Sequence, residues 1–151
     1  MQVRLATNED APAIASNNIA LAKDSENISL DPETALKGVM ILLNQAEKGF
    51  YLVAEQQGTI IGQVMVTFEW SDWRARTIWW LQSIYVTPQC RRQGVMRTLI
   101  SAVSSMAAKQ DVLELRLYVH MDNYSAIQAY KHITMQELSY KLFSMPVVVN
   151  Q

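Results

Sequence analysis

Apolar and polar positions alternate in some stretches of the chain and recur at helical spacing in others. Alternation with period two predicts strands, and recurrence every three or four residues predicts helices. The expected order is β-α-α-β-β-β-α-β-α-β, which is typical of an α/β domain with a mixed sheet. In chain order the elements are expected at residues 2–7, 8–23, 31–49, 50–56, 59–70, 78–86, 95–106, 112–119, 123–130 and 137–145.

Local signals support several of these boundaries. Residues 24–32 are mainly polar and predict a connector between the first two helices, and Gly49 suits the end of the second helix. Gln57-Gly58 predicts the turn of a hairpin. The strand expected at residues 78–86 (IWWLQSIYV) is apolar on both faces, so we expect it to be central and covered on both sides.

The composition favours one globular domain that spans residues 1–151. Half of the residues are apolar, the net charge is −1, and no long basic run suggests nucleic-acid binding. Cys90 is the only cysteine, which excludes an internal disulfide and favours a reducing compartment. We find neither a secretory signal pattern nor an apolar run of transmembrane length, so we expect a soluble cytoplasmic protein.

The stretch VTPQCRRQGVMRTLISAV, residues 86–103, predicts a strand that runs through a short turn into a helix. The free N–H groups at the start of such a helix favour an anion. Gly94 allows close approach of a ligand, and Arg91 and Arg92 add donors suited to phosphate. The stretch is neither a Walker loop nor a dinucleotide fingerprint. Taken alone, it is explained equally well by a helix start with solvated arginines.

The surrounding motifs resemble those of the GCN5-related N-acetyltransferase (GNAT) family. The pattern Gln/Arg-x-x-Gly-x-Gly/Ala of that family's acetyl-CoA loop falls on residues 91–96, with Met96 where the family prefers Gly or Ala. Residues 84–88 match the end of the family's preceding strand. A later signature matches Asn123, Ala126 and Tyr130, although Thr134-Met135 occupies the place of a frequent Gly-Phe.

The resemblance implies a GNAT fold, a central mixed sheet flanked by helices, and transfer of acetyl from acetyl-CoA to a small-molecule amine by direct attack. CoA would be the product, and a homodimer is a family-level expectation. Backbone groups of the strand would pair with the pantetheine arm, one N–H near Ile84 or Tyr85 would stabilise the oxyanion, and the loop amides would bind the pyrophosphate. The cofactor-binding residues implied are Ile84, Tyr85, Val86, Arg91, Arg92, Gln93, Gly94, Val95, Met96, Arg97, Asn123 and Tyr130.

The resemblance makes Tyr130 the candidate general acid, since a phenol can protonate the departing thiolate. A core tyrosine on a short helix is the alternative interpretation. The attacking amine must also lose a proton, and the strand at 78–86 offers no acid for this. Glu69, at the end of the preceding strand, and Asp72 are the nearest candidates in the sequence, and Glu69 could instead be a solvated carboxylate at a strand end. A water relay without a dedicated base is a third option.

The run FEWSDWRARTIWW, residues 68–80, brings four tryptophans, two acids and two arginines close together in sequence. Aromatic walls with acids suit an organic cation, whereas tryptophans also fill cores and dimer interfaces. The candidate substrate-binding residues are Glu69, Trp70, Asp72, Trp80 and Gln82. We predict no metal site. Two other functions stay open, a CoA-binding regulatory module with little or no turnover and a protein or peptide N-acetyltransferase.

Overall fold

The computed structural model describes residues 1–149, and its internal contacts divide the chain into two compact units that meet between His120 and Met121. The first unit contains β1 (Gln2–Leu5), α1 (Ala11–Glu26), α2 (Pro32–Asn44), β2 (Phe50–Gln56), β3 (Thr59–Ser71), β4 (Arg76–Val86), α3 (Val95–Lys109) and β5 (Leu115–Arg116). The second unit contains α4 (Tyr124–His132). We describe each unit by itself.

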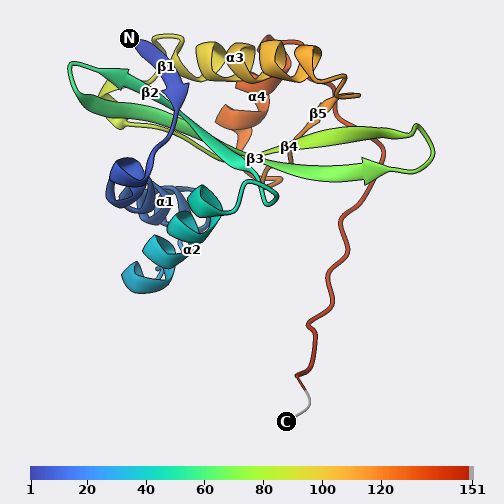
Figure 1. Ribbon diagram of the computed structural model, residues 1–151, viewed down its shortest axis with the longest axis horizontal. Coiled ribbons are helices and arrows are strands. Elements are labelled where there is room, and N and C mark those ends of the chain that lie inside the picture. The colour runs from blue at the N-terminus through green and yellow to red at the C-terminus, as the bar shows by residue number, and fades with distance from the viewer. Residues whose placement is uncertain (150–151) are drawn as a thin grey trace. The chain divides into compact units, whose positions relative to one another are not determined.

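The five strands of the first unit form one sheet in the order β1-β2-β3-β4-β5. All neighbours are antiparallel except β4 and β5, which are parallel, so the sheet is mixed as predicted. Helix α3 covers one face, and α1 and α2 cover the other (Figure 1). On β3, Val64 and Val66 therefore face α3, whereas Met65 packs against the cluster formed by α1 and α2.

The apolar stripes of α1 and α2 explain their pairing. Ile14 on α1 and Val39 on α2 are almost completely buried with Val53 of β2. Such burial contributes about 25 cal/mol per Å² of apolar surface. At the start of α2, the Asp31 carboxylate accepts a hydrogen bond from the N–H of Thr34 at 2.9 Å, which caps the helix as the sequence suggests.

Two helix ends differ from the sequence-based expectation. Helix α1 continues through residues 24–26 to a left-handed cap at Asn27, because a polar sequence on the solvent side does not stop a helix. Helix α2 ends at Asn44, so the role predicted for Gly49 is wrong. Gly49 instead begins the approach to β2, where a Cβ would overlap the backbone carbonyl of Val66.

Three strand predictions also need correction. The strand expected at 112–119 is paired over only two residues, and residues 137–145 form no strand. Alternation shows which side chains could share a face, but a strand needs a neighbour along its whole length. Strand β4 lies fourth in the order rather than at the centre, and its covering is incomplete, with Ile78 and Trp79 buried and Trp80 half-buried.

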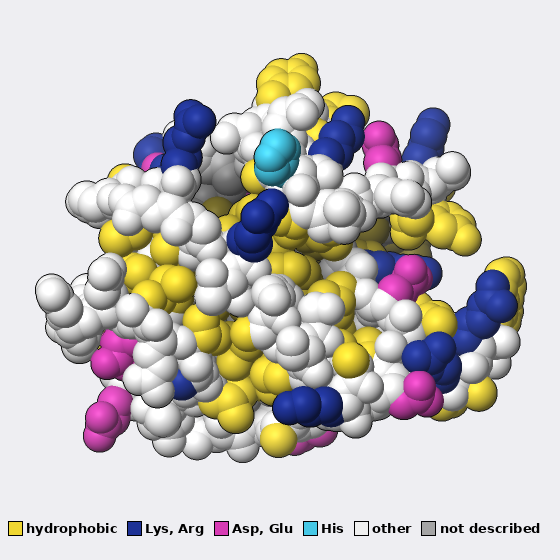
Figure 2. Space-filling view, turned by 90° about the horizontal axis from the view of Figure 1, so that it is seen from above, with side chains coloured by type: hydrophobic (Ala, Val, Ile, Leu, Met, Phe, Trp, Pro, Cys, Tyr) yellow, Lys and Arg dark blue, Asp and Glu magenta, His cyan; other side chains and the backbone are white. Residues whose placement is uncertain are grey.

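The described part of the chain has no helix with both the length and the apolar character needed to cross a membrane. Lys and Arg side chains stand in separate groups on the face drawn in Figure 2 and form no continuous basic band there.

Candidate functional site

Strand β4 carries a bulge at Ser83. Gln63 of β3 pairs with Tyr85 and Met65 pairs with Gln82. An advance of two residues along β3 therefore corresponds to three residues along β4, which has one extra residue in this stretch. Ser83 adopts a left-handed backbone with φ of +49°, which is uncommon for a residue other than glycine. A bulge of this kind bends the strand and redirects it.

Beyond the bulge, one edge of β4 is open. Pairing with β5 is limited to Trp79–Leu115 and Trp80–Arg116, so residues 81–86 have no strand partner on that side in the described structure. The Thr87 N–H bonds to the Ile61 carbonyl at 2.9 Å. The backbone N–H and C=O groups of successive strand residues point to opposite sides. Those of Tyr85 therefore point towards β3, as those of Thr87 do, and those of Ile84 and Val86 point towards the open edge. An extended ligand could pair with this edge.

A buried amide holds the bulge against α1. Gln63 is completely buried, and its Nε2 donates to Asn18 Oδ1 at 2.8 Å and to the Ser83 carbonyl at 3.3 Å. Its Oε1 accepts from Asn17 Nδ2 at 3.0 Å. Asn18 in turn donates to the hydroxyl of Tyr51 at 3.4 Å, and burial raises the pKa of that phenol. Every polar atom of Gln63 thus helps to join α1 to the bend in β4.

Gln63 is not among the site residues predicted from the sequence. One signal for it is present in the sequence, a single amide side chain inside the apolar run IIGQVMV. A polar side chain at a core position needs hydrogen-bond partners, so it indicates a buried network. The partners themselves lie on α1, about 45 positions away along the chain, and no local pattern indicates them.

We predict that Gln63→Leu lowers the free energy of unfolding by about 2 kcal/mol or more, because it leaves the amides of Asn17 and Asn18 without a buried partner. Urea unfolding monitored by circular dichroism measures the loss. Gln56→Leu, at the exposed end of β2, is the matched control and should change stability little. Equal effects of the two substitutions would contradict the role of the network.

The turn after β4 exposes a row of backbone N–H groups. Arg92 and Gly94 both adopt left-handed conformations, with φ of +61° and +83°. The first intrahelical bond of α3 runs from the Thr98 N–H to the Gly94 carbonyl at 3.0 Å, so the N–H groups of residues 95–97 precede the hydrogen bonds of the helix itself. Such successive N–H groups at the positive end of a helix dipole form an anion-binding nest.

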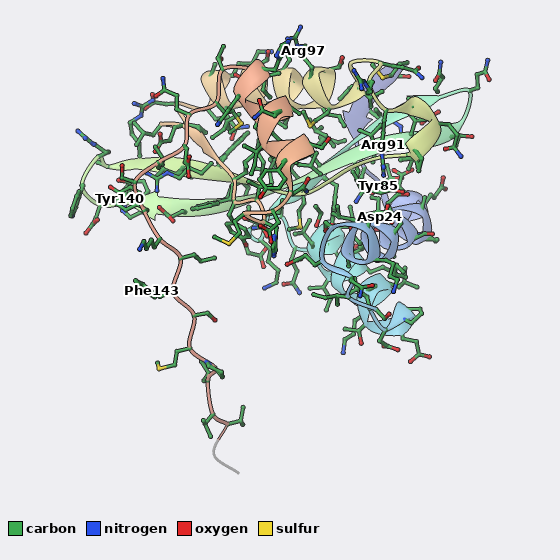
Figure 3. The ribbon with its side chains drawn as sticks, turned by 180° about the vertical axis from the view of Figure 1, so that it is seen from behind. Asp24, Tyr85, Arg91, Arg97, Tyr140 and Phe143 are labelled. Atoms are coloured by element: carbon green, nitrogen blue, oxygen red, sulfur yellow. The ribbon has the colours of Figure 1, made fainter. Side chains whose placement is uncertain are left out.

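The arginines of this turn have different roles. Arg91 Nε donates to the Val86 carbonyl at 2.9 Å, and its guanidinium lies 3.6 Å from Asp24 and 5.4 Å from the centre of the Tyr85 ring. Figure 3 shows Arg91 near Tyr85 and on the same side of the molecule as Asp24 of α1. Arg91 therefore fastens the turn to β4 and α1. Arg92 and Arg97 are exposed and have no ion pair in the described residues, and Arg97 points away from the sheet.

A solvent-open cavity of about 420 Å³ follows α3 from its first turn. It is lined by Arg97, Thr98, Ser101, Ala102 and Ser105. A guanidinium together with three hydroxyl groups suits a polar, negatively charged ligand group.

The side chains expected to bind substrate do not all lie on the same face of the sheet. Glu69, Trp80 and Gln82 share the face opposite α3, where Trp80 Nε1 donates to Glu69 Oε1 at 3.2 Å. Glu69 also lies 3.7 Å from a guanidinium nitrogen of Arg116. Trp70 projects from the other face of β3, and Asp72 lies in the exposed turn between β3 and β4.

The four tryptophans do not form one aromatic pocket, contrary to the interpretation from their spacing. Trp79 packs in the core against Phe50 with ring centres 5.3 Å apart. Trp80 lies 5.5 Å from the ring of Tyr118 at the surface. Trp70 and Trp73 are exposed. Closeness in sequence does not bring these side chains together, because alternate residues of a strand face opposite sides and the turn extends beyond the core.

The second unit holds the two remaining candidates. The Asn123 side chain caps α4, with its Oδ1 accepting from the Ala126 N–H at 3.2 Å. Tyr130 is half-buried near the other end of the helix. Burial raises the pKa of the Tyr130 phenol above its ordinary value of 10, so the group is protonated at neutral pH.

Three comparisons relate this arrangement to known proteins. The sequence profile of the Acetyltransferase (GNAT) family matches residues 20–133. A crystal structure of a possible acetyltransferase from Clostridium difficile 630 is 34% identical, with a TM-score of 0.91 over 97% of each chain. Crystal structures at 22% identity or below share the fold, among them a probable acetyltransferase with a TM-score of 0.86, covering 99% of this chain and 100% of that one.

Curated relatives match over a shorter stretch. The thialysine N-epsilon-acetyltransferase of Mus musculus is 34% identical over 86 residues, which is 56% of this chain and 50% of that protein. An uncharacterized N-acetyltransferase of Methanocaldococcus jannaschii is 30% identical over 97 residues, 64% of this chain and 42% of that protein. The chain thus spans half or less of the length of these relatives.

Proposed function

The chain belongs to the acetyltransferase (GNAT) family, and on this premise we propose that it transfers the acetyl group of acetyl-CoA to a primary amine of a small molecule. It would be an N-acetyltransferase that releases CoA and an acetylated amine. The observation that carries this proposal is the open edge of β4, which leads directly into the N–H nest at the start of α3. Together these features offer backbone donors to an extended arm and to an anion.

The residues present suit the two ends of the cofactor. The backbone groups of Ile84 and the N–H of Val86 on the open edge would pair with the pantetheine arm, while Arg91 donates to the Val86 carbonyl and holds the strand end in place. The N–H groups of residues 92–97 would hold the pyrophosphate, and Arg92 and Arg97 would add positive charge. When bound, acetyl-CoA supplies an activated thioester carbonyl.

In the reaction itself, the amine nitrogen attacks the thioester carbonyl and the carbon–sulfur bond breaks. The Ile84 N–H is the donor we favour for the developing oxyanion, since Tyr85 faces β3. Tyr130 would donate its phenolic proton to the departing sulfur. Glu69 would accept the amine proton after releasing Trp80 or Arg116, with a water relay as the alternative route.

The acceptor is proposed to be a small organic cation. Glu69, Trp80 and Gln82 offer a carboxylate, an indole face and an amide on one surface of the sheet. A carboxylate beside an aromatic ring suits an ammonium group, through charge pairing and cation–π contact. The mouse relative, whose name specifies thialysine as its substrate, supports a small amine as the first class to examine.

Two measurements on the full chain test the function. Acetyl-CoA at 100 times its dissociation constant should stabilise the fold by about 2.7 kcal/mol and raise the melting temperature by about 5–10 °C. Release of free CoA thiol should then depend on the added amine, across polyamines, lysine analogues, aminoglycosides and peptides. An acetylated form of each amine serves as the control.

The possible outcomes separate the alternatives. A stabilising shift without thiol release from any amine would favour a CoA-binding regulatory module. Turnover with peptides alone would favour a protein or peptide N-acetyltransferase. The absence of both a shift and turnover would contradict the proposal.

A further inference from the structure

The amide of Gln63 meets the bulge of β4 with its donor side. Gln63 is completely buried, and its Nε2 atom carries two protons. One proton is donated to Asn18 Oδ1 at 2.8 Å and the other to the Ser83 carbonyl at 3.3 Å. A carbonyl can only accept, so the group that faces it has to be the NH2 group of the amide. The contact with Ser83 thus determines which way the Gln63 amide is turned.

The carbonyl that Gln63 holds belongs to the same peptide group as the Ile84 N–H. A peptide group is planar and trans, so the Ser83 C=O and the Ile84 N–H point in opposite directions from one rigid plane. The carbonyl points to Gln63, which lies on β3. The Ile84 N–H therefore points away from β3 and towards the open edge of β4. This N–H is the group that we assign to the oxyanion under the proposed function.

The direction of this peptide plane has to be held, because the bulge itself does not fix it. Ser83 has a φ of +49°, which is unfavourable for a residue with a Cβ. On the open side, residues 81–86 have no strand partner in the described structure, so no sheet hydrogen bond fixes the plane there. The Ser83 side chain hydrogen-bonds to the buried Tyr51 phenol, which holds the side chain but not the peptide plane that follows it.

The other atoms of the Gln63 amide are anchored to α1. Its Oε1 accepts from Asn17 Nδ2 at 3.0 Å, and Asn18 at the next position of the helix accepts from Nε2. The amide is therefore held on two sides and cannot follow the carbonyl if the peptide rotates. A carbonyl that accepts a hydrogen bond also polarises its own peptide group, which makes the N–H of that group a better donor.

We propose that Gln63 is a positioning residue for acetyl transfer, which fixes the Ile84 N–H in the direction needed to stabilise the oxyanion. This role rests on the proposed function, because it concerns the thioester carbonyl of the same donor. A hydrogen-bond donor that is held in place before the reaction needs no reorganisation when negative charge develops. Gln63 is buried in the core, so it acts through the peptide group between Ser83 and Ile84 and not by contact with a substrate.

Gln63→Met in the full chain tests this role. Methionine has a similar length but donates no hydrogen bond, so kcat should fall at least about tenfold, since loss of a whole oxyanion donor costs about 10²–10³-fold. The KM for acetyl-CoA should stay nearly unchanged, because the turn at residues 91–96 keeps its own contacts. Val39→Ala is the matched control for stability. Val39 is buried between α1 and α2, away from the bulge, and its loss should lower the melting temperature while kcat is kept.

The Ile84 amide resonance gives a second readout that needs no turnover. In ¹⁵N-labelled protein, Gln63→Met should shift or broaden the Ile84 N–H signal, because the peptide group loses its hydrogen bond, and Val39→Ala should leave the signal in place. If Gln63→Met is too unstable to measure, Ser83→Gly relieves the positive φ at the bulge. The comparison is then made between Ser83→Gly and the double variant Ser83→Gly/Gln63→Met.

The outcomes distinguish this role from the proposed function. Turnover by the wild type with an unchanged kcat in Gln63→Met would overturn the positioning role alone. An equal fall of kcat in Val39→Ala, or an Ile84 signal that does not move in Gln63→Met, would limit Gln63 to stability and would also overturn it. Absence of turnover in the wild type would contradict the proposed function and, with it, the role of Gln63.

Discussion

Replacing Tyr130 with phenylalanine should lower kcat about 100-fold while the KM for acetyl-CoA stays nearly unchanged, if the phenol protonates the departing thiolate. General acid catalysis contributes about 10²–10⁴-fold, and phenylalanine keeps the ring but removes the proton. Because burial raises the pKa of Tyr130, any alkaline loss of kcat in the wild type should begin at a higher pH than an ordinary phenol would give. Thiol release at saturating amine, measured across pH, gives both quantities.

Tyr124→Phe is the matched control for this prediction. Tyr124 lies on the same helix, is 71% exposed, and should keep full activity when its hydroxyl is removed. Thermal melting of both variants separates a lost proton donor from a damaged helix. Full activity of Tyr130→Phe would remove Tyr130 from the mechanism and leave the core-tyrosine interpretation.

Gly94→Ala should raise the KM for acetyl-CoA about tenfold or more with a smaller effect on kcat. Gly94 has a φ of +83°, a conformation that costs an alanine about 1–2 kcal/mol, so the turn should relax and the nest should open. Loss of one backbone hydrogen bond to a phosphate corresponds to about tenfold in affinity. Initial rates at varied acetyl-CoA measure the change.

The chain provides a closely matched control in Gly58. Its φ is +75°, and at both glycines a Cβ would meet nothing within 4 Å, so backbone strain is the shared effect of substitution. Gly58→Ala in the β2–β3 turn should lower stability by a similar amount and leave the KM unchanged. If both variants raised the KM equally, the effect would reflect general destabilisation and not the nest.

The order of elements from β1 to α4 and the turn at residues 91–96 could be predicted from the sequence because each depends on local pattern. Gln57 and Gly58 form the predicted hairpin turn, and both adopt positive φ. The family resemblance is confirmed by the profile that matches residues 20–133 and by the fold. The individual roles assigned to site residues remain predictions.

Features that depend on distant contacts could not be predicted. The spacing of the four tryptophans gave no indication that β3 and β4 extend beyond their core cover, which leaves Trp70 exposed. Arg91 contacts the Val86 carbonyl and Asp24, and Asp24 lies on α1, far from Arg91 in the sequence. Alternation at residues 137–145 predicted a strand that the structure does not have, because pairing requires a neighbouring edge that the local sequence does not specify.

The open edge of β4 has an evolutionary consequence if the proposed function holds. The main-chain atoms of Ile84 and Val86 would bind the cofactor there, whereas the side chains of Trp80 and Gln82 would bind the acceptor. Main-chain groups survive most substitutions. Descendants of this chain could therefore change acceptor by mutating these two side chains without first losing the acetyl donor, provided that Gln63 and its partners keep the bend.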